Sequence, residues 1–182
     1  ISFINLLAAF SFGWLNQSIL RYGSTFDKNS NLVCSLTIGF SMGFIFILII
    51  LFILYQLQFP IKFSLIVVLT FAGSIGLFNL YKIWFQSMEL PKKVIFLTAL
   101  QSVLMLGCAY GVVSIYGPKG MSLIMGVSLG YLIPCLPLLK SIKINKIWTD
   151  NNKRIVAKFF KFGAPLSLWF GLSLSLNFLD RY

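Results

Sequence analysis

The chain contains no histidine and only four acidic residues among 182. The acids are Asp27, Glu89, Asp150 and Asp180. Most metal sites, histidine-based catalytic triads and mechanisms that use two carboxylates need these residue types. We therefore expect a protein that is not an enzyme and that carries no metal and no cofactor.

Cysteine is also scarce. Its three copies, Cys34, Cys108 and Cys135, lie within or at the edge of apolar runs. None of their spacings is one of the short spacings that bind zinc. We expect all three to pack as small apolar side chains.

Charged residues are also few: only 10% of the residues are charged, whereas 58% are hydrophobic. The mean hydropathy is +0.90. This composition is typical of integral membrane proteins. Fifteen basic residues give a net charge of +11, a value that often indicates nucleic-acid binding. Here the basic residues lie between apolar stretches and form no separate domain, so no nucleic-acid partner is expected.

Six stretches are long and apolar enough to cross a bilayer, which takes about 20 residues. They are continuously apolar, without the alternation of period two that marks barrel strands. We therefore predict an all-α fold, a polytopic membrane helix bundle. The six predicted helices cover about 1–20, 33–57, 62–84, 93–116, 119–139 and 162–182.

The connections between these helices alternate in charge. The first, third and fifth hold twelve basic residues, and the second and fourth hold only Lys62 and Lys119. By the positive-inside rule the basic connections are cytoplasmic. The first residue then lies on the outer side.

The stretch 141–161 is the one long connection. It combines a cluster of basic residues with apolar residues such as Trp148 and Phe159. We predict a basic linker that forms a helix at the cytoplasmic interface, where it anchors to lipid, serves as a hinge, or does both. It separates five helices of a first transmembrane lobe, 1–140, from the first helix of a second lobe, 162–182. Because the chain starts at Ile1 inside an apolar run, we expect an internal fragment of a longer transporter.

Small residues recur at every fourth position on several of these helices, which lets helices approach closely in lipid. Close packing is one interpretation, and the lining of a water-filled cleft is the other. The stripes are Ser35, Gly39 and Gly43; Gly107 and Gly111; Ser122, Gly126 and Gly130; and Gly163, Ser167, Gly171 and Ser175.

Two pairs of polar residues lie four residues apart on apolar helices. Gln17 precedes Arg21, and Asn177 precedes Arg181, so each pair shares a helical face. Arginine binds phosphate through two parallel hydrogen bonds and stays charged when partly desolvated. We predict that these four residues and Asp180 bind an anionic substrate. Alternatively, Arg21 reaches the headgroups, and Asp180 and Arg181 neutralise charge within the protein.

Five further polar or aromatic side chains on apolar helices are weaker candidates for a binding site. Each of them, taken alone, also fits a contact between helices. They are Asn79, Tyr81, Gln86, Gln101 and Tyr110.

Two segments carry a resemblance to a known family. They are WLNQSILRY at 14–22 and KFGAPLSLWFGLSLSLNFLDRY at 161–182. Both are similar to stretches of the polysaccharide or O-antigen flippases of the multidrug/oligosaccharidyl-lipid/polysaccharide exporter superfamily. The stretch YGPKG at 116–120 is similar to the family's glycine-rich entry to another helix.

The resemblance implies two bundles of six helices around a central cavity, with this chain covering the second to the seventh helix. The implied partners are the bilayer, a lipid-linked oligosaccharide and other polysaccharide-assembly membrane proteins. The implied cargo is an oligosaccharide on undecaprenyl pyrophosphate, moved across the bacterial inner membrane by alternating access. Arg21 and Arg181 would then attract the pyrophosphate.

Two other functions remain open. A multidrug exporter of the same superfamily would couple to cations through buried carboxylates, and Asp180 is the one acid predicted within a membrane helix. A polytopic polysaccharide polymerase or glycosyltransferase would tend to have a sizeable outer loop or a carboxylate-bearing site, whereas both outer connections here are short.

Overall fold

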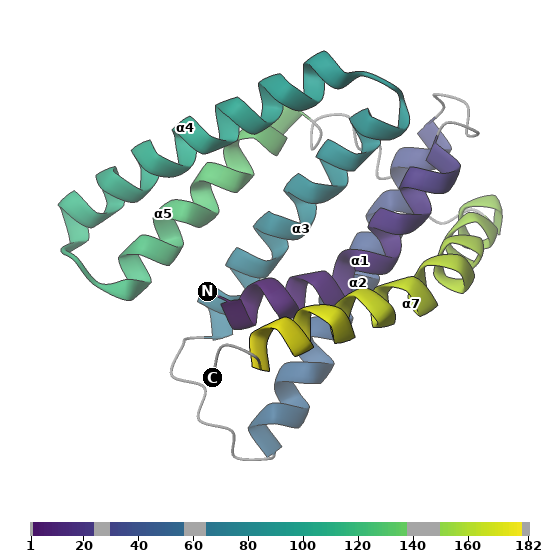
Figure 1. Ribbon diagram of the computed structural model, residues 1–182, viewed down its shortest axis with the longest axis horizontal. Coiled ribbons are helices and arrows are strands. Elements are labelled where there is room, and N and C mark those ends of the chain that lie inside the picture. Colours follow the sequence, from purple (N-terminus) through teal and green to yellow (C-terminus); the bar gives the residue numbers. More distant parts are fainter. Residues whose placement is uncertain (1, 24–29, 57–64, 138–149, 180–182) are drawn as a thin grey trace.

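The computed structural model describes residues 2–23, 30–56, 65–137 and 150–179, and its elements there are all helical (Figure 1). The predicted all-α class is thus confirmed for these residues. The elements are α1 (Ser2–Tyr22), α2 (Ser30–Gln56), α3 (Leu65–Ser87), α4 (Pro91–Tyr116), α5 (Gly120–Leu132), the 3-10 turn η2 (Ile133–Cys135) and α7 (Asp150–Leu179).

Three segments of the described residues are long and apolar enough to cross a membrane. They are Ser35–Ile53 within α2, the whole of α3 and the whole of α4. Gly120–Cys135 is apolar but shorter. The fold is therefore a helical bundle with the features of a membrane protein.

Helix α4 has start and stop signals that the sequence explains. Pro91 occupies the first turn, where its missing N–H costs no hydrogen bond. Gly117 follows the last turn with a positive φ of 82°, a conformation that glycine adopts without steric cost. The N–H of Gly117 donates to the carbonyl oxygen of Val113 at 2.9 Å, which closes the helix. A short connection to α5 then makes α4 and α5 antiparallel neighbours.

The last helix differs from the expected boundaries. Instead of beginning near 162, α7 begins at Asp150 and continues through Pro165 to Leu179. Its first half is not only interfacial, because Ile155, Val156 and Phe159 are buried in the core. This packing explains why the helix is continuous where a linker was predicted. Residues 141–149 of that linker lie outside the described residues.

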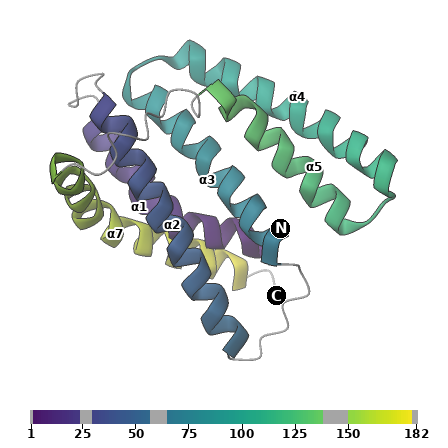
Figure 2. The same cartoon turned by 180° about the vertical axis from the view of Figure 1, so that it is seen from behind.

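Helix α1 lies at the centre of the arrangement, in contact with α2, α3 and α7. The hairpin of α4 and α5 packs on α3, on the opposite side from α7 (Figures 1 and 2). Buried apolar residues form two clusters, one around Phe12 and Phe71 and the other around Trp14 and Phe159. Tyr131 of α5 packs against both.

Small residues set the closest contacts between helices. Gly163 of α7 lies directly on the backbone carbonyl of Trp14, and Gly126 of α5 lies on the backbone of α4 at Ala109. Close packing is therefore confirmed at Gly163 and Gly126. The stripe on α4 differs, because nothing among the described residues lies within 4 Å of a Cβ placed at Gly107 or Gly111.

Large apolar side chains cover the outer surfaces of α2 and α4. Ile95, Val103 and Tyr110 of α4 are 70%, 69% and 79% exposed, and Phe52 of α2 is 62% exposed. A water-soluble monomer rarely exposes such a continuous apolar surface. The hydrocarbon core of a bilayer suits it.

Gly163, which contacts α1, and Gly107, which faces open space, should respond differently to substitution by alanine. Gly163→Ala places a methyl group against the Trp14 carbonyl and the Ser18 hydroxyl, so the helices must move apart. We expect a loss of about 1–3 kcal/mol in unfolding free energy. Gly107→Ala meets open space and should be neutral or stabilising by up to about 1 kcal/mol. Thermal unfolding of both variants in detergent measures this, and equal destabilisation would contradict the assigned contact.

Candidate functional site

A polar cavity of about 430 Å³ lies between α1, α3, α5 and α7. Four amide side chains line it, together with the hydroxyl-bearing residues Tyr131 and Ser167. The amides are Asn5, Asn16 and Gln17 from α1 and Asn79 from α3. None of its lining residues is charged. Such a lining offers many hydrogen-bond donors and acceptors to an uncharged polar ligand.

The spacing on α1 explains how this helix supplies most of the amides. At about 100° per residue, Asn5 and Asn16, eleven positions apart, fall on one side of the helix. Phe12 and Ala9 lie on the same stripe and also line the cavity. Trp14 lies about 180° from Asn5 and points away from it.

One side-chain oxygen of a residue that lines the cavity is buried without a hydrogen-bond partner. The Oδ1 of Asn16 has no donor within reach among the described residues. A buried carbonyl oxygen without a partner costs about 1–3 kcal/mol, so such atoms are rare in folded proteins. Because this oxygen has almost no accessible surface, a ligand in the cavity would reach it only after the Asn16 side chain turns.

Apolar surface complements these polar groups. Phe12, Ile75 and Ile83 line the cavity beside the amides. Phe12 is held rigidly, because it stacks on Phe40 with ring centroids 4.8 Å apart and lies close to Gly76. The cavity thus combines fixed apolar surface with convergent amides.

The contact between α1 and α7 closes one side of the cavity. A Cβ at Gly13 would lie 3.2 Å from the Cβ of Ser167. Near the same crossing, the Ser18 hydroxyl donates to the carbonyl oxygen of Phe159 at 2.6 Å. Ser167 lines this cavity and also an apolar pocket on the other side of the contact, so the α1–α7 contact separates the two spaces.

The predicted pair of Gln17 and Arg21 is divided between two places. Gln17 lines the cavity, but Arg21 does not and is exposed. The guanidinium carbon of Arg21 lies 4.3 Å from the ring centroid of Phe162 and 5.5 Å from that of Tyr22. Lys158 shares the second ring, with its Nζ 4.4 Å from the Tyr22 centroid. Arg21 thus belongs to a cationic, aromatic end of the α1–α7 contact.

The other three predicted site residues are not placed beside these two. Asn177 lies in α7, but its side chain is outside the described part of the structure, as are Asp180 and Arg181. Their proposed role therefore remains a prediction. Of the weaker candidates, Asn79 lines the cavity. Gln101 instead donates to the sulfur of Met105, at 3.5 Å.

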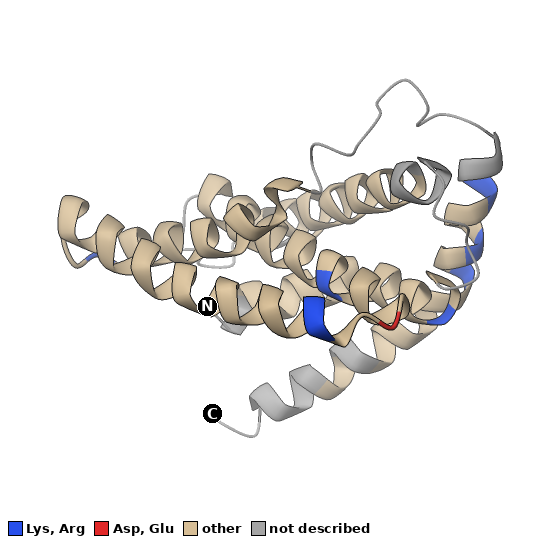
Figure 3. Cartoon of the chain, turned by 90° about the horizontal axis from the view of Figure 1, so that it is seen from above, with Lys and Arg blue, Asp and Glu red and all other residues tan. Residues whose placement is uncertain are grey.

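Basic residues gather at one end of the bundle (Figure 3). This end comprises the last turn of α1, the first turn of α4 and the first half of α7. Lys119 marks the opposite end, between α4 and α5. The spatial separation agrees with the alternation of basic and non-basic connections in the sequence. The basic end would attract anionic groups.

Asn5, Asn16 and Tyr131 were not predicted from the sequence as members of a site. The pattern of α1 contains a signal for the first two, because they share a face on an otherwise apolar helix. Ser167 belongs to a stripe of small residues for which the lining of a cleft was one of two interpretations. Tyr131 carries no comparable signal, because its place depends on how α5 packs.

Two substitutions on α1 separate a ligand-binding polar group from a structural one. Asn16→Leu removes a buried oxygen that has no described partner, so we expect an unchanged or higher melting temperature. Ser18→Ala removes the hydrogen bond to Phe159 and should cost about 1 kcal/mol. Thermal unfolding in detergent checks both. A large loss of stability in Asn16→Leu alone would show that the amide has a structural role.

Comparisons with known proteins add no family assignment. No protein-family model matches the chain, and neither a curated protein nor a solved structure matches it. Function therefore has to be argued from the cavity, the charge distribution and the sequence.

Proposed function

We propose that this chain forms part of a flippase that exports an oligosaccharide linked to undecaprenyl pyrophosphate, such as a repeat unit of O-antigen, capsule or exopolysaccharide. The observation that carries the proposal is the uncharged cavity lined by four amides inside a bundle of apolar helices. Sugar hydroxyls both donate and accept hydrogen bonds, as the amides do. The resemblance of 14–22 and 161–182 to the flippases supports the same cargo.

The cavity disfavours a cation as the cargo. Exporters of cationic drugs need carboxylates in the membrane, and no acid among the described residues lines this cavity. Glu89, whose side chain is described, is exposed in the turn between α3 and α4. The basic end instead suits an anionic group on the cargo.

The proposed topology has six membrane crossings in a bacterial inner membrane, with the basic end in the cytoplasm. It includes α1 and α7, which are less apolar than α2, α3 and α4. In α1, the amides that lower its hydropathy line the cavity, where Asn5 is exposed and Asn16 and Gln17 are half-buried. In α7, the basic residues from Lys153 to Lys161 all lie in the first half, where they would reach the cytoplasmic headgroups.

The charged part of the cargo would bind separately from its sugars. We assign the pyrophosphate to Arg21 at the basic end in the state open to the cytoplasm, and to Arg181, with Asn177 and Asp180 nearby in sequence, in the later state. The helix α7 extends about 25 Å from Phe162, which contacts Arg21, to Leu179, so the two arginines would act one after the other. Sugars would enter the amide-lined cavity, and the lipid tail would stay in the bilayer. Alternating access would open the cavity first to the cytoplasm and then to the periplasm. Other polysaccharide-assembly membrane proteins would supply and consume the cargo.

Deletion of the parent gene tests this proposal. We expect complete lipid-linked repeat units to accumulate on the cytoplasmic leaflet, as measured with a probe that reaches only the periplasmic leaflet. Asn79→Leu should fail to restore their export, whereas Gln86→Leu, an exposed amide on the same helix, should restore it. Arg181→Ala should also fail at normal membrane levels. Normal sidedness in the deletion strain would refute the flippase assignment and favour a drug exporter.

Cysteine labelling tests the proposed topology. In a background without Cys34, Cys108 and Cys135, we introduce Lys119→Cys or Lys93→Cys. A membrane-impermeant thiol reagent should label position 119 in intact spheroplasts and position 93 only after lysis, because the two lie at opposite ends of α4. Labelling of both positions in intact cells would contradict the orientation.

A further inference from the structure

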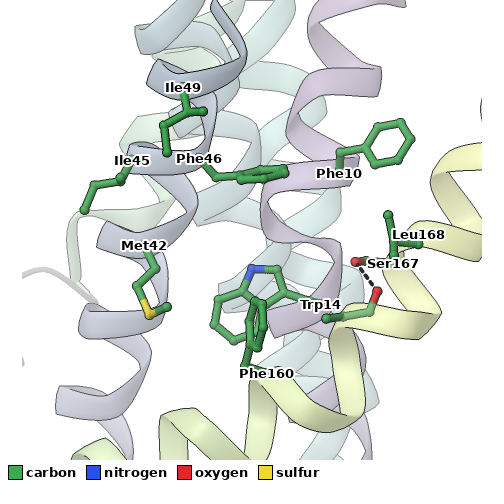
Figure 4. A pocket seen from close by; sticks show the side chains of 10 residues that line it. Phe10, Trp14, Met42, Ile45, Phe46, Ile49, Phe160, Ser167 and Leu168 are labelled. Atoms are coloured by element: carbon green, nitrogen blue, oxygen red, sulfur yellow. Dashed lines mark hydrogen bonds between the residues drawn. The ribbon is translucent and has the colours of Figure 1, made fainter. Parts of the chain in front are cut away.

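An apolar pocket of about 450 Å³ lies between α1, α2 and α7 (Figure 4). It is separate from the amide-lined cavity and faces the other side of α1. Trp14 and Phe160 close one end of it, with their ring centroids 5.4 Å apart (Figure 4). The lining residues are Phe10, Trp14, Met42, Ile45, Phe46, Ile49, Phe160, Ala164, Ser167 and Leu168.

The pocket opens to the outer surface of the bundle. Met42, Ile45 and Ile49 of α2 are 41%, 56% and 50% exposed, and Leu168 of α7 is 57% exposed. These α2 residues belong to the segment Ser35–Ile53, whose hydropathy of 2.7 fits a membrane crossing. The hydrocarbon chains of the bilayer therefore have direct access to the pocket. No charged or amide side chain lines it.

The closed end of the pocket lies next to the basic part of α7. Phe160 is the first α7 residue of the lining, and Lys161 follows it, about 20° from the lining residue Leu168 around the helix. Lys161 is exposed, whereas Lys158 lies about 160° from Phe160 around the helix, with its Nζ 4.4 Å from the ring centroid of Tyr22, which does not line the pocket. An apolar slot with an ammonium group at one end matches an amphiphile that has an anionic head and a hydrocarbon chain.

We propose that this pocket binds one acyl chain of an anionic phospholipid of the cytoplasmic leaflet, with the lipid phosphate at Lys161. The chain would pack on the indole of Trp14, which is oriented by its Nε1 hydrogen bond to the Ser11 carbonyl oxygen at 2.9 Å. Burial of the chain supplies affinity, and the lysine adds selectivity for negative headgroups. The pocket is on the opposite side of the α1–α7 contact from the amide-lined cavity, so bulk lipid is a better occupant than the cargo.

Tryptophan quenching by brominated lipids tests the site. In the protein with Trp84, Trp148 and Trp169 replaced by phenylalanine, Trp14 is the tryptophan left in the sequence. This variant is placed in nanodiscs of phosphatidylcholine that contain either brominated phosphatidylglycerol or brominated phosphatidylcholine. We expect the brominated phosphatidylglycerol to quench Trp14 more strongly at equal mole fraction.

Two variants and their matched controls identify the pocket. Ala164→Phe fills the slot and should abolish the preference for phosphatidylglycerol, whereas Ala99→Phe on the exposed face of α4 should not. Lys161→Gln leaves the slot intact and should lower the preference roughly fivefold. Its control is Lys158→Gln, one turn away on α7, which removes a charge that packs on Tyr22 and should leave the preference unchanged.

Three results would overturn the proposal. They are equal quenching by the two lipids, a preference that survives Lys161→Gln, and displacement of the brominated phosphatidylglycerol by a low mole fraction of undecaprenyl phosphate. The last would assign the pocket to the cargo chain. Because the lysine variant keeps the packing of the pocket, the test holds even if Ala164→Phe fails to fold. All of these measurements are independent of oligosaccharide export.

Discussion

The close contact between α1 and α7 is the constraint on which the rest of the structure depends. Gly163 lets the two backbones meet at Trp14, and the Ser18 hydroxyl joins them through the carbonyl oxygen of Phe159. A larger residue at 163 would separate the helices. This contact closes the amide-lined cavity on one side and the apolar pocket on the other, with Ser167 lining both.

Helix α1 provides two chemically different faces because of this position. The face with Asn5 and Asn16 lines the cavity, and the face with Trp14 lines the apolar pocket. Arg21 lies two turns beyond Trp14 and so reaches the aromatic side chains of the α1–α7 contact. One helix therefore separates a site suited to sugars from a site suited to hydrocarbon.

Sequence alone predicted the helical class and the uneven distribution of basic residues, because both follow from local composition. It also predicted close helix packing at Gly126 and Gly163, where small residues recur every fourth position. It misplaced the start of the last helix, because Ile155 and Phe159 gain their burial from α1, far away in the sequence. The cavity was predicted only in part. Gln17 and Asn79 were singled out, whereas Tyr131 and Ser167 join them through tertiary packing.

Photo-crosslinking from the cavity tests the central claim that the amides contact the cargo. A photoreactive amino acid is introduced at Asn79, which lines the cavity, or at Ala99, which is exposed on α4. Illumination of cells that make radiolabelled lipid-linked oligosaccharide should attach sugar label to the protein from position 79 and not from position 99. Equal labelling from both positions, or no label from position 79 in a protein that still supports export, would contradict the account.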